Sequence, residues 1–340
     1  MQKEKLLIIR FSSFGDIIQT LSVVECFLNK YPQAEIHWAV RADFLELLKY
    51  HPKITKIWSL DRKQGFAGLW KLTKQLQSEK YTHVYDAHNN LRSRFLSFFL
   101  WPKFFLRRGK DRLKRFLLFN FRINFYPKRL LAHDTYINPL KKWNIPNAPL
   151  KNSQLYIPEE LKQKIQSKIP FKTFTALIPS AAWALKRWPI EYWKQMIEAS
   201  PDKNYVILGG PQDTFLNELV TPENKSRVLN LSGQLSLLES CAVVSISNAS
   251  VGCDTGLSHA ADQLGIPIVF LTGPTAFGLP SRASSKSMEV DLWCRPCSKD
   301  GRGKCKNSTY KKCLYDIKPK DVHEELNTLG TSRDTSNGRL

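Results

Sequence analysis

The sequence predicts an α/β protein made of two doubly wound, Rossmann-like halves. Short, almost entirely apolar runs alternate with amphipathic helical patterns such as 67–78, which is typical of buried parallel strands covered by helices. Two such halves in one chain would place a ligand cleft between them, above the carboxyl ends of both sheets. The expected strands lie at 6–9, 35–40, 83–86, 174–178, 205–208, 243–247 and 266–271.

The length of the chain also favours two domains. With 340 residues, 42% of them hydrophobic, the chain exceeds what one core usually organises. A polar, lysine-rich connection punctuated by prolines separates the two patterns. We therefore expect domains over 1–150 and 173–329, a linker over 151–172 and a disordered tail over 330–340.

The net charge of the chain and the absence of certain sequence motifs limit the classes of function that it can have. The formal net charge of +21 favours polyanionic partners: nucleic acid, a membrane surface or phosphorylated sugars. The start of the chain does not resemble a secretory signal, and the longest apolar-rich stretch, 95–106, is too short to span a bilayer. We expect a cytoplasmic protein with mostly reduced cysteines. The glycine motifs of dinucleotide oxidoreductases and P-loop enzymes do not occur.

The strongest local signal is the segment 248–261. Asp254, Thr255 and Gly256 lie where a helix should begin, so free backbone N–H groups and the positive helix end suit a diphosphate. His259 falls one turn later on the same face. The simpler interpretation is that Asp254 caps the helix and that His259 is a core histidine.

A second signal is the loop 178–189, which joins the first strand of the second half to a helix expected near Pro189. Lys186 and Arg187 would border the same cleft. A cation there can neutralise the charge that grows on a departing nucleotide diphosphate. The alternative is an ordinary solvated basic loop.

A third signal, 12–16, follows the first strand. Gly15 lets the backbone turn tightly. Asp16 then lies at the cleft edge of the first half, where a carboxylate can take the proton from a hydroxyl that attacks an anomeric carbon. Alternatively, Asp16 only favours the helix N-terminus.

Taken together, these segments resemble the bacterial ADP-heptose:lipopolysaccharide heptosyltransferases, glycosyltransferase family 9, and in pattern the heptosyltransferase II type. The resemblance covers nearly the whole chain. It implies a GT-B fold whose first domain binds the acceptor and whose second domain binds the nucleotide sugar. It also implies metal-independent, inverting transfer of heptose from ADP-heptose to the lipid A-linked inner core of lipopolysaccharide. Five segments match in the family's order: 8–16, 86–93, 186–189, 254–259 and 273–275.

The matching motifs imply roles for individual residues. Asp16 becomes the general base, its loop steadied by Ser12 and Ser13, and Lys186 becomes a phosphate ligand. The implied donor site consists of Ser180, Lys186, Gln212, Asp254, Thr255, Gly256 and His259.

On the acceptor side, the resemblance points to Ser12 and Ser13 and to the arginines Arg92 and Arg94. Their guanidinium groups can pair bidentately with carboxylates or phosphates of an inner-core oligosaccharide, although Arg94 can equally be a helix-surface residue. The sequence departs from the family's pattern at Ala181 and Ala182, where many relatives have hydroxyl residues or glycine. It also departs at Gln212, where a carboxylate often serves the ribose.

The stretch 92–131 interleaves Phe, Leu and Trp with many Lys and Arg, and Asp111 is its only acid. Such a basic amphipathic surface suits an anionic leaflet, where each nearby cation adds about 1 kcal/mol. We therefore expect the protein to lie peripherally on the inner face of the cytoplasmic membrane.

Four cysteines near the C-terminus form the pattern C-x2-C-x7-C-x7-C: Cys294, Cys297, Cys305 and Cys313. The pattern is compatible with a structural zinc site, and free packed thiols are the alternative. The resemblance implies no required cofactor besides the nucleotide-sugar substrate.

Two other functions stay open on the sequence. The same fold would serve a transferase for another nucleotide sugar, or a nucleotide-sugar epimerase. A pI near 9.7 and many aromatic residues also suit a nucleic-acid-binding protein, but no helix-turn-helix, RRM or zinc-finger signature accompanies the charge, so we expect no nucleic-acid partner.

Overall fold

The computed structural model describes residues 3–127, 130–147, 152–275 and 277–334. The chain forms two compact units, each built on its own parallel sheet. The first unit comprises Met1–Arg112 and Ala132–Tyr156, and the second comprises Leu113–Leu131 and Ile157–Leu340. Among the described residues, no helix is long and apolar enough to cross a membrane.

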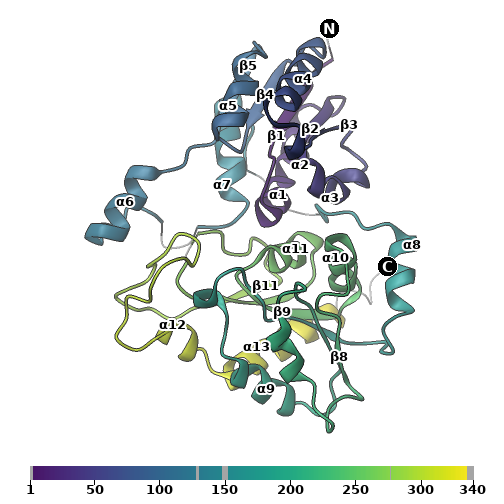
Figure 1. Cartoon of the computed structure of the whole chain (residues 1–340), viewed down its shortest axis with the longest axis vertical. Coiled ribbons are helices and arrows are strands. Elements are labelled where there is room, and N and C mark those ends of the chain that lie inside the picture. The colour runs from purple at the N-terminus through teal and green to yellow at the C-terminus, as the bar shows by residue number, and fades with distance from the viewer. Residues whose placement is uncertain (1–2, 128–129, 148–151, 276, 335–340) are drawn as a thin grey trace. The chain divides into compact units, whose positions relative to one another are not determined.

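The first unit has a five-stranded sheet in the order β3-β2-β1-β4-β5, with all pairs parallel (Figure 1). The central strand has neighbours on both sides, and its four apolar residues, Leu6 to Ile9, are fully buried. The strands are β1 (Lys5–Ile9), β2 (Glu35–Arg41), β3 (Lys56–Leu60), β4 (His83–Asp86) and β5 (Phe104–Arg107). The helices are α1 (Phe14–Thr20), α2 (Ser22–Lys30), α3 (Glu46–Lys49), α4 (Gly65–Ser78), α5 (Leu91–Phe98) and α7 (Asp134–Ile137), with 3-10 turns η1 (Ala42–Phe44), η2 (Arg62–Gln64) and η3 (Asn138–Trp143).

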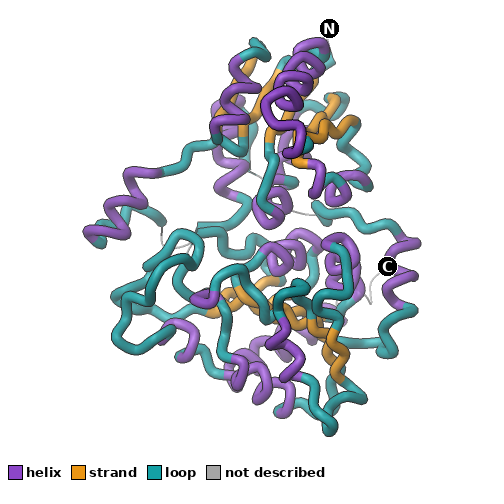
Figure 2. Tube along the Cα trace, in the orientation of Figure 1, coloured by secondary structure: helices purple, strands orange, loops and turns teal. Residues whose placement is uncertain are grey.

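The second unit has a six-stranded sheet in the order β11-β10-β9-β6-β7-β8, again entirely parallel; Figure 2 shows its strands in orange. The strands are β6 (Thr175–Ile178), β7 (Tyr205–Ile207), β8 (Val228–Asn230), β9 (Ala249–Cys253), β10 (Ile268–Leu271) and β11 (Ser285–Met288). The helices are α8 (Glu159–Gln166), α9 (Ile190–Glu198), α10 (Leu237–Ile246), α11 (Gly256–Leu264), α12 (Lys312–Tyr315) and α13 (Pro319–Asp334), with 3-10 turns η4 (Ala184–Lys186) and η5 (Thr214–Leu219). Helix α6 (Arg112–Phe121) starts at the boundary between the two units.

One expected strand was wrong. Residues 243–247 belong largely to α10, and the strand is the next segment, β9. Four consecutive residues of α10, Cys241 to Val244, are buried, so the run resembles a buried strand. A helix signal was present in the capping box at its start: Glu239 N donates to Ser236 Oγ (3.2 Å) and Ser236 N donates to Glu239 Oε2 (2.9 Å).

The unit boundaries differ in detail from the ranges expected from the sequence. The segment Leu113–Leu131 packs in the second unit, where Arg122 Nη1 donates to the carbonyls of Cys294 and Pro296, both at 3.1 Å. Helix α13 continues to Asp334, anchored by buried Val322 and Leu326, so part of the expected disordered tail is helical. Residues 335–340 of that tail lie outside the described residues.

Candidate active site

In each unit the strand order reverses beside the first strand, and the candidate residues lie at that place. In the first sheet, β1 lies between β2 and β4; in the second, β6 lies between β7 and β9. Ligands of open α/β sheets bind beyond the carboxyl ends of the strands at such a switch point. Asp16 lies in the first turn of the helix that follows β1, and Lys186 and Asp254 follow β6 and β9.

In the first unit, four side chains form what we call the Asp16 cluster: Arg10, Ser13, Asp16 and Tyr136. Arg10 is buried; its Nη1 donates to the carbonyl of Ala87 (2.7 Å) and its Nη2 lies 2.5 Å from Asp16 Oδ2. Ser13 donates to the same oxygen through Oγ (2.7 Å) and through its backbone N–H (3.2 Å). The hydroxyl of Tyr136 donates to the other oxygen, Oδ1, at 2.6 Å.

These donors leave one acceptor position on the Asp16 carboxylate. A carboxylate has about four lone-pair directions, two on each oxygen. Among the described residues, Oδ2 receives three donors, whereas Oδ1 receives only the Tyr136 hydroxyl. The Asp16 side chain is 35% exposed.

The surroundings of the Asp16 carboxyl favour its ionised form. Its burial favours the neutral form, but the charge of Arg10 and the hydrogen bonds from Tyr136 and Ser13 outweigh burial and hold its pKa well below the usual range. The interpretation of Asp16 as only a helix-terminus residue therefore accounts for part of its contacts: it lies in the first turn of α1 and accepts from Ser13, yet it also pairs with two side chains outside that helix.

Beyond β4, a second polar turn carries the two arginines that the sequence predicted for the acceptor side. Asp86 is fully buried; its Oδ1 accepts from the N–H of Asn89 (2.7 Å) and its Oδ2 from Arg107 Nε (2.9 Å). Arg94 Nε donates to Asn89 Oδ1 (2.9 Å), and Arg92 is exposed on the same helix, α5. The turn thus fixes Arg94 and leaves Arg92 open to solvent.

In the second unit, Asp254 is the centre of what we call the Lys186 cluster: Lys186, Asp254, His259 and Thr275. Lys186 Nζ lies 2.8 Å from Asp254 Oδ2, and the hydroxyl of Thr275 donates to the same oxygen. His259 Nε2 lies 3.5 Å from Asp254 Oδ1, and its buried Nδ1 has no hydrogen-bond partner among the described residues. Burial disfavours the ionised carboxylate, but Lys186 and His259 outweigh burial and lower the pKa of Asp254.

The start of α11 lies where the sequence predicted it. The residue that caps the helix is Thr255, not Asp254, so the simpler interpretation of Asp254 as a capping residue does not fit its contacts. Gly252 in β9 lets the helix approach closely, because a Cβ there would meet Ser258 Oγ at 2.2 Å. The free N–H groups at this helix end are available to an anion.

A neighbouring loop is held by Asp213. Its Oδ2 accepts from the hydroxyl of Ser180 and from the N–H of Gly210 (2.8 Å), and Arg187 Nη2 lies 3.3 Å from its Oδ1. Gln212, the residue singled out from the sequence, is exposed. The carboxylate of this loop therefore stands one position after the glutamine.

The sequence of the chain matches a known protein family and several known proteins. The model of glycosyltransferase family 9 (heptosyltransferase) matches residues 69–311, more than half of the chain. The chain belongs to this family. It is 22% identical to lipopolysaccharide heptosyltransferase 1 of Pseudomonas aeruginosa, over 94% of this chain and 92% of that protein. It is 27% identical to lipopolysaccharide heptosyltransferase 2 of Escherichia coli K12, with 96% and 98% covered.

The fold agrees with that of a solved family 9 structure. The structure of the E. coli ADP-heptose lps heptosyltransferase II has a TM-score of 0.75 to this chain at 23% identity, with 97% of this chain and 99% of that chain covered. The expected fold is therefore confirmed: this family 9 chain has a GT-B fold with two Rossmann-like units.

Four residues around the candidate site were not predicted from the sequence: Arg10, Tyr136 and Thr275 of the two clusters, and Asp213 of the neighbouring loop. Arg10 and Thr275 lie inside segments that match the family motifs. Tyr136 lies 120 positions from its partner Asp16, in a region without a local motif. Asp213 is adjacent to Gln212, the residue that the sequence had singled out.

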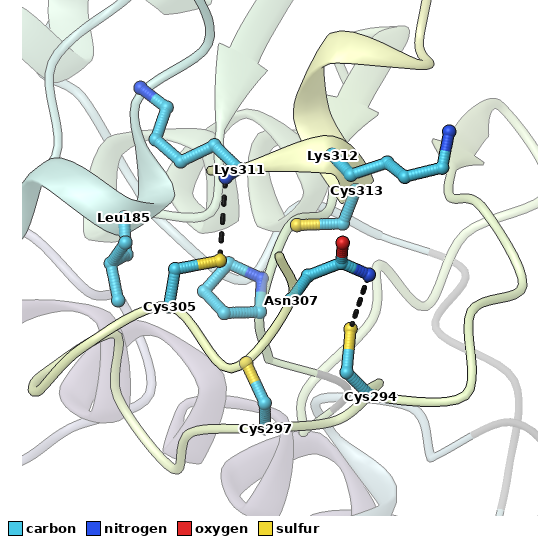
Figure 3. Close-up of a pocket in the computed structure, with 9 residues that line it drawn as sticks. Leu185, Cys294, Cys297, Cys305, Asn307, Lys311, Lys312 and Cys313 are labelled. Carbon is cyan, nitrogen blue, oxygen red and sulfur yellow. Dashed lines mark hydrogen bonds between the residues drawn. The ribbon is translucent and has the colours of Figure 1, made fainter. Parts of the chain in front are cut away.

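The four C-terminal cysteines of this family 9 chain line one pocket, together with Leu185, Pro274, Asn307, Lys311 and Lys312 (Figure 3). All four are free thiols. In the part of the chain that the structure describes, no three His, Cys, Asp or Glu side chains converge as ligands of a metal ion. The zinc site stays a prediction.

Proposed function

We propose that this family 9 glycosyltransferase transfers heptose from ADP-heptose to the inner core of lipopolysaccharide, with inversion and without a metal ion. The names of its relatives, which are lipopolysaccharide heptosyltransferases in P. aeruginosa and E. coli, support this donor and acceptor. The observation that carries the mechanism is the ionised Asp16 carboxylate with one free position on Oδ1.

In the proposed reaction, the acceptor's hydroxyl oxygen attacks the anomeric carbon of heptose from the face opposite the diphosphate. The bond between that carbon and the diphosphate oxygen breaks, and ADP leaves with the electron pair. The hydroxyl proton passes to Asp16 Oδ1, which acts as general base. Attack from the opposite face inverts the anomeric centre.

The departing ADP gains negative charge, and the Lys186 cluster supplies the compensation. Lys186 is already held by Asp254 at 2.8 Å, so its ammonium group is in place when the donor arrives. The free N–H groups of Thr255 and Gly256 and the positive end of α11 add to this stabilisation. Together they provide the charge that a metal ion supplies in other enzymes.

We test the base by Asp16→Asn. The amide cannot accept the proton, so kcat should fall about 10² to 10⁴-fold, while ADP binding measured by calorimetry should stay within about twofold because ADP binds at the Lys186 cluster. Asp43→Asn is the control, since Asp43 pairs with Arg41 on the surface. Near-normal turnover of Asp16→Asn would remove Asp16 as the base.

The donor is tested by thermal stabilisation with ADP-, UDP- and GDP-linked sugars, because a ligand that binds the folded state raises Tm. ADP-heptose should raise Tm most. ADP should be released only when a lipopolysaccharide acceptor is present. Conversion of the sugar without an acceptor would instead indicate an epimerase.

We further propose that the stretch 92–131 holds the protein on an anionic membrane. Of the ten residues of α6, only Leu118 is buried. Leu113, Phe116 and Phe121 are each more than half exposed, as is Trp101 earlier in the stretch. Exposed aromatic residues beside arginines are typical of interfacial segments.

The structure directs the choice of variants for this test. Arg107 pairs with Asp86, and Arg108 donates to Thr135, so reversing them would disturb the fold. Arg112 and Lys114 are exposed, and Arg112→Glu with Lys114→Glu should weaken binding to phosphatidylglycerol vesicles at least about tenfold. The control reverses Lys63 and Lys71, which are exposed outside the stretch. Equal vesicle binding by both double variants would discard the membrane role.

A further inference from the structure

The loop between β11 and α12 reaches the donor lysine through Gly301. Gly301 is buried and has a φ of +90°, and a Cβ built on it would lie 2.6 Å from Lys186 Cγ and 2.8 Å from Lys186 Cδ. The backbone of Gly301 therefore lies directly against the aliphatic stem of Lys186. A side chain at this position would have to displace that stem.

Neighbouring contacts hold the loop against the turn that carries Lys186. The N–H of Gly301 donates to Ser298 Oγ (2.9 Å), and that hydroxyl donates to the carbonyl of Arg302 (3.0 Å). The guanidinium of Arg302 lies 4.7 Å from the ring centroid of Trp183. Trp183 in turn accepts the N–H of Lys186 at its carbonyl (2.9 Å).

The base of the same loop is packed around the thiol pocket. Leu185, the residue before Lys186, lines this pocket with the four cysteines (Figure 3). The N–H of Lys311 donates to Cys305 Sγ (3.4 Å), and Asn307 Nδ2 donates to Cys294 Sγ (3.5 Å). The turn of Lys186 is thus contacted by the loop at two places, Gly301 and the thiol pocket.

We propose that the cysteine-rich loop, residues 294–313, is a positioning element that orders the Lys186 stem for the diphosphate of the donor. This inference rests on the proposed function, which assigns Lys186 to that diphosphate. A lysine has a flexible four-carbon stem, and ordering it before the ligand arrives lowers the entropic cost of binding. Gly301 provides the surface against which the stem is ordered, and Asp254 holds its end.

Gly301→Ala tests the contact, and Gly303→Ala is its matched control. Gly303 has a φ of +93°, and a Cβ there would meet nothing within 4 Å. Both glycines have nearly the same positive φ, but only the Cβ of Gly301→Ala collides with Lys186; it would also lie 3.2 Å from Trp183 Cβ, a milder contact. We expect ADP to bind at least about tenfold more weakly to Gly301→Ala, with less than about a twofold change for Gly303→Ala.

A double-mutant cycle with Lys186→Ala separates positioning from damage to the loop. Alanine at 186 has no Cγ or Cδ, so Gly301→Ala should neither weaken ADP binding nor lower Tm further in that background than Gly303→Ala does. An additional loss that persists without the lysine stem would mean that Gly301 serves the loop alone, and would overturn the proposal. This cycle also decides the case in which Gly301→Ala folds poorly.

Failure of the inference differs from failure of the proposed function. If Lys186→Ala binds ADP as the wild type does, the assignment of Lys186 to the donor is wrong. If Lys186→Ala loses ADP affinity while Gly301→Ala behaves like Gly303→Ala, the assignment stands and the positioning role is wrong.

Discussion

The hydroxyl of Tyr136 donates a 2.6 Å hydrogen bond to Oδ1 of Asp16, the carboxylate oxygen with fewer donors among the residues that the structure describes. The tyrosine is fully buried, and its ring lies 4.3 Å from the guanidinium of Arg108 and 5.6 Å from that of Arg10. Its backbone carbonyl accepts from Tyr85 OH (2.8 Å). Contacts on several sides therefore hold the Tyr136 ring in place. Its hydroxyl occupies one acceptor position of Asp16 Oδ1 and so limits where another donor can bind to that oxygen.

Tyr136→Phe should raise the pKa of Asp16 toward its ordinary value of 3.8, because a donor to the ionised form is lost. A carboxyl with a depressed pKa stabilises the fold above its unfolded pKa and loses that contribution as pH falls through the folded pKa. The variant should therefore be less stable at pH 7, and the difference in Tm from wild type should narrow as pH falls below about 4. A difference that is equal at every pH would show that the hydroxyl does not act on the ionised carboxylate.

Arg10→Met should destabilise the first unit. Arg10 is 5% exposed, and its loss removes a charged donor from Asp16 and a donor from the Ala87 carbonyl. We expect about 2 to 3 kcal/mol in urea unfolding, less than for a fully buried pair because Asp16 is partly exposed. Arg41→Met, which breaks the surface pair with Asp43, should cost at most about 1 kcal/mol. Equal costs for the two variants would contradict the importance of the buried pair.

Asp213→Ala should lower the stability of the second unit by about 1 to 3 kcal/mol, because Ser180, Gly210 and Arg187 lose their acceptor. Gln212→Ala should change it by no more than about 0.5 kcal/mol, since the glutamine is exposed. Measuring ADP-heptose affinity on both variants tests the predicted role of Gln212. Unchanged affinity in Gln212→Ala would remove that residue from the donor site.

Gly252→Ala should destabilise the protein by about 1 to 3 kcal/mol, because the new Cβ would lie 2.2 Å from Ser258 Oγ. Ser258→Ala removes that oxygen but also its hydrogen bond to the Cys253 carbonyl (2.7 Å). The double variant should therefore be more stable than the sum of the single changes by about 1 kcal/mol. If the free-energy changes of the two single variants are strictly additive, the destabilisation by Gly252→Ala does not come from its contact with Ser258 Oγ.

Sequence reasoning identified the parts of the site that are local. The turn at 12–16 and the loop around Lys186 each follow a correctly predicted strand, so strand–turn–helix periodicity was enough to find them. The helix start after Asp254 was predicted correctly, although the strand before it, β9, was not. The five matching segments then gave the family, which the comparison confirmed. The interpretation failed at 243–247, where burial on all sides of α10 removed the helical period.

The partners that tune these residues could not be read from one sequence. Tyr136 reaches Asp16, and Thr275 reaches Asp254, only through the order of strands in each sheet. Tertiary contacts between distant positions carry no periodic signal. For the same reason, the sequence did not predict the contact of Gly301 with Lys186. In that segment, sequence analysis had singled out only the cysteines.

The assignment of residues 113–131 to the second unit has a practical consequence for experiments that express the two units separately. Since the chain enters the second unit at Leu113, leaves it after Leu131 and returns at Ile157, neither unit is one continuous stretch of polypeptide. A fragment that ends near residue 150 would carry Arg122 without the carbonyls of Cys294 and Pro296 that it binds. To express the second unit alone, residues 113–131 would have to be joined to residues 157–340 in one polypeptide, for example through a designed linker.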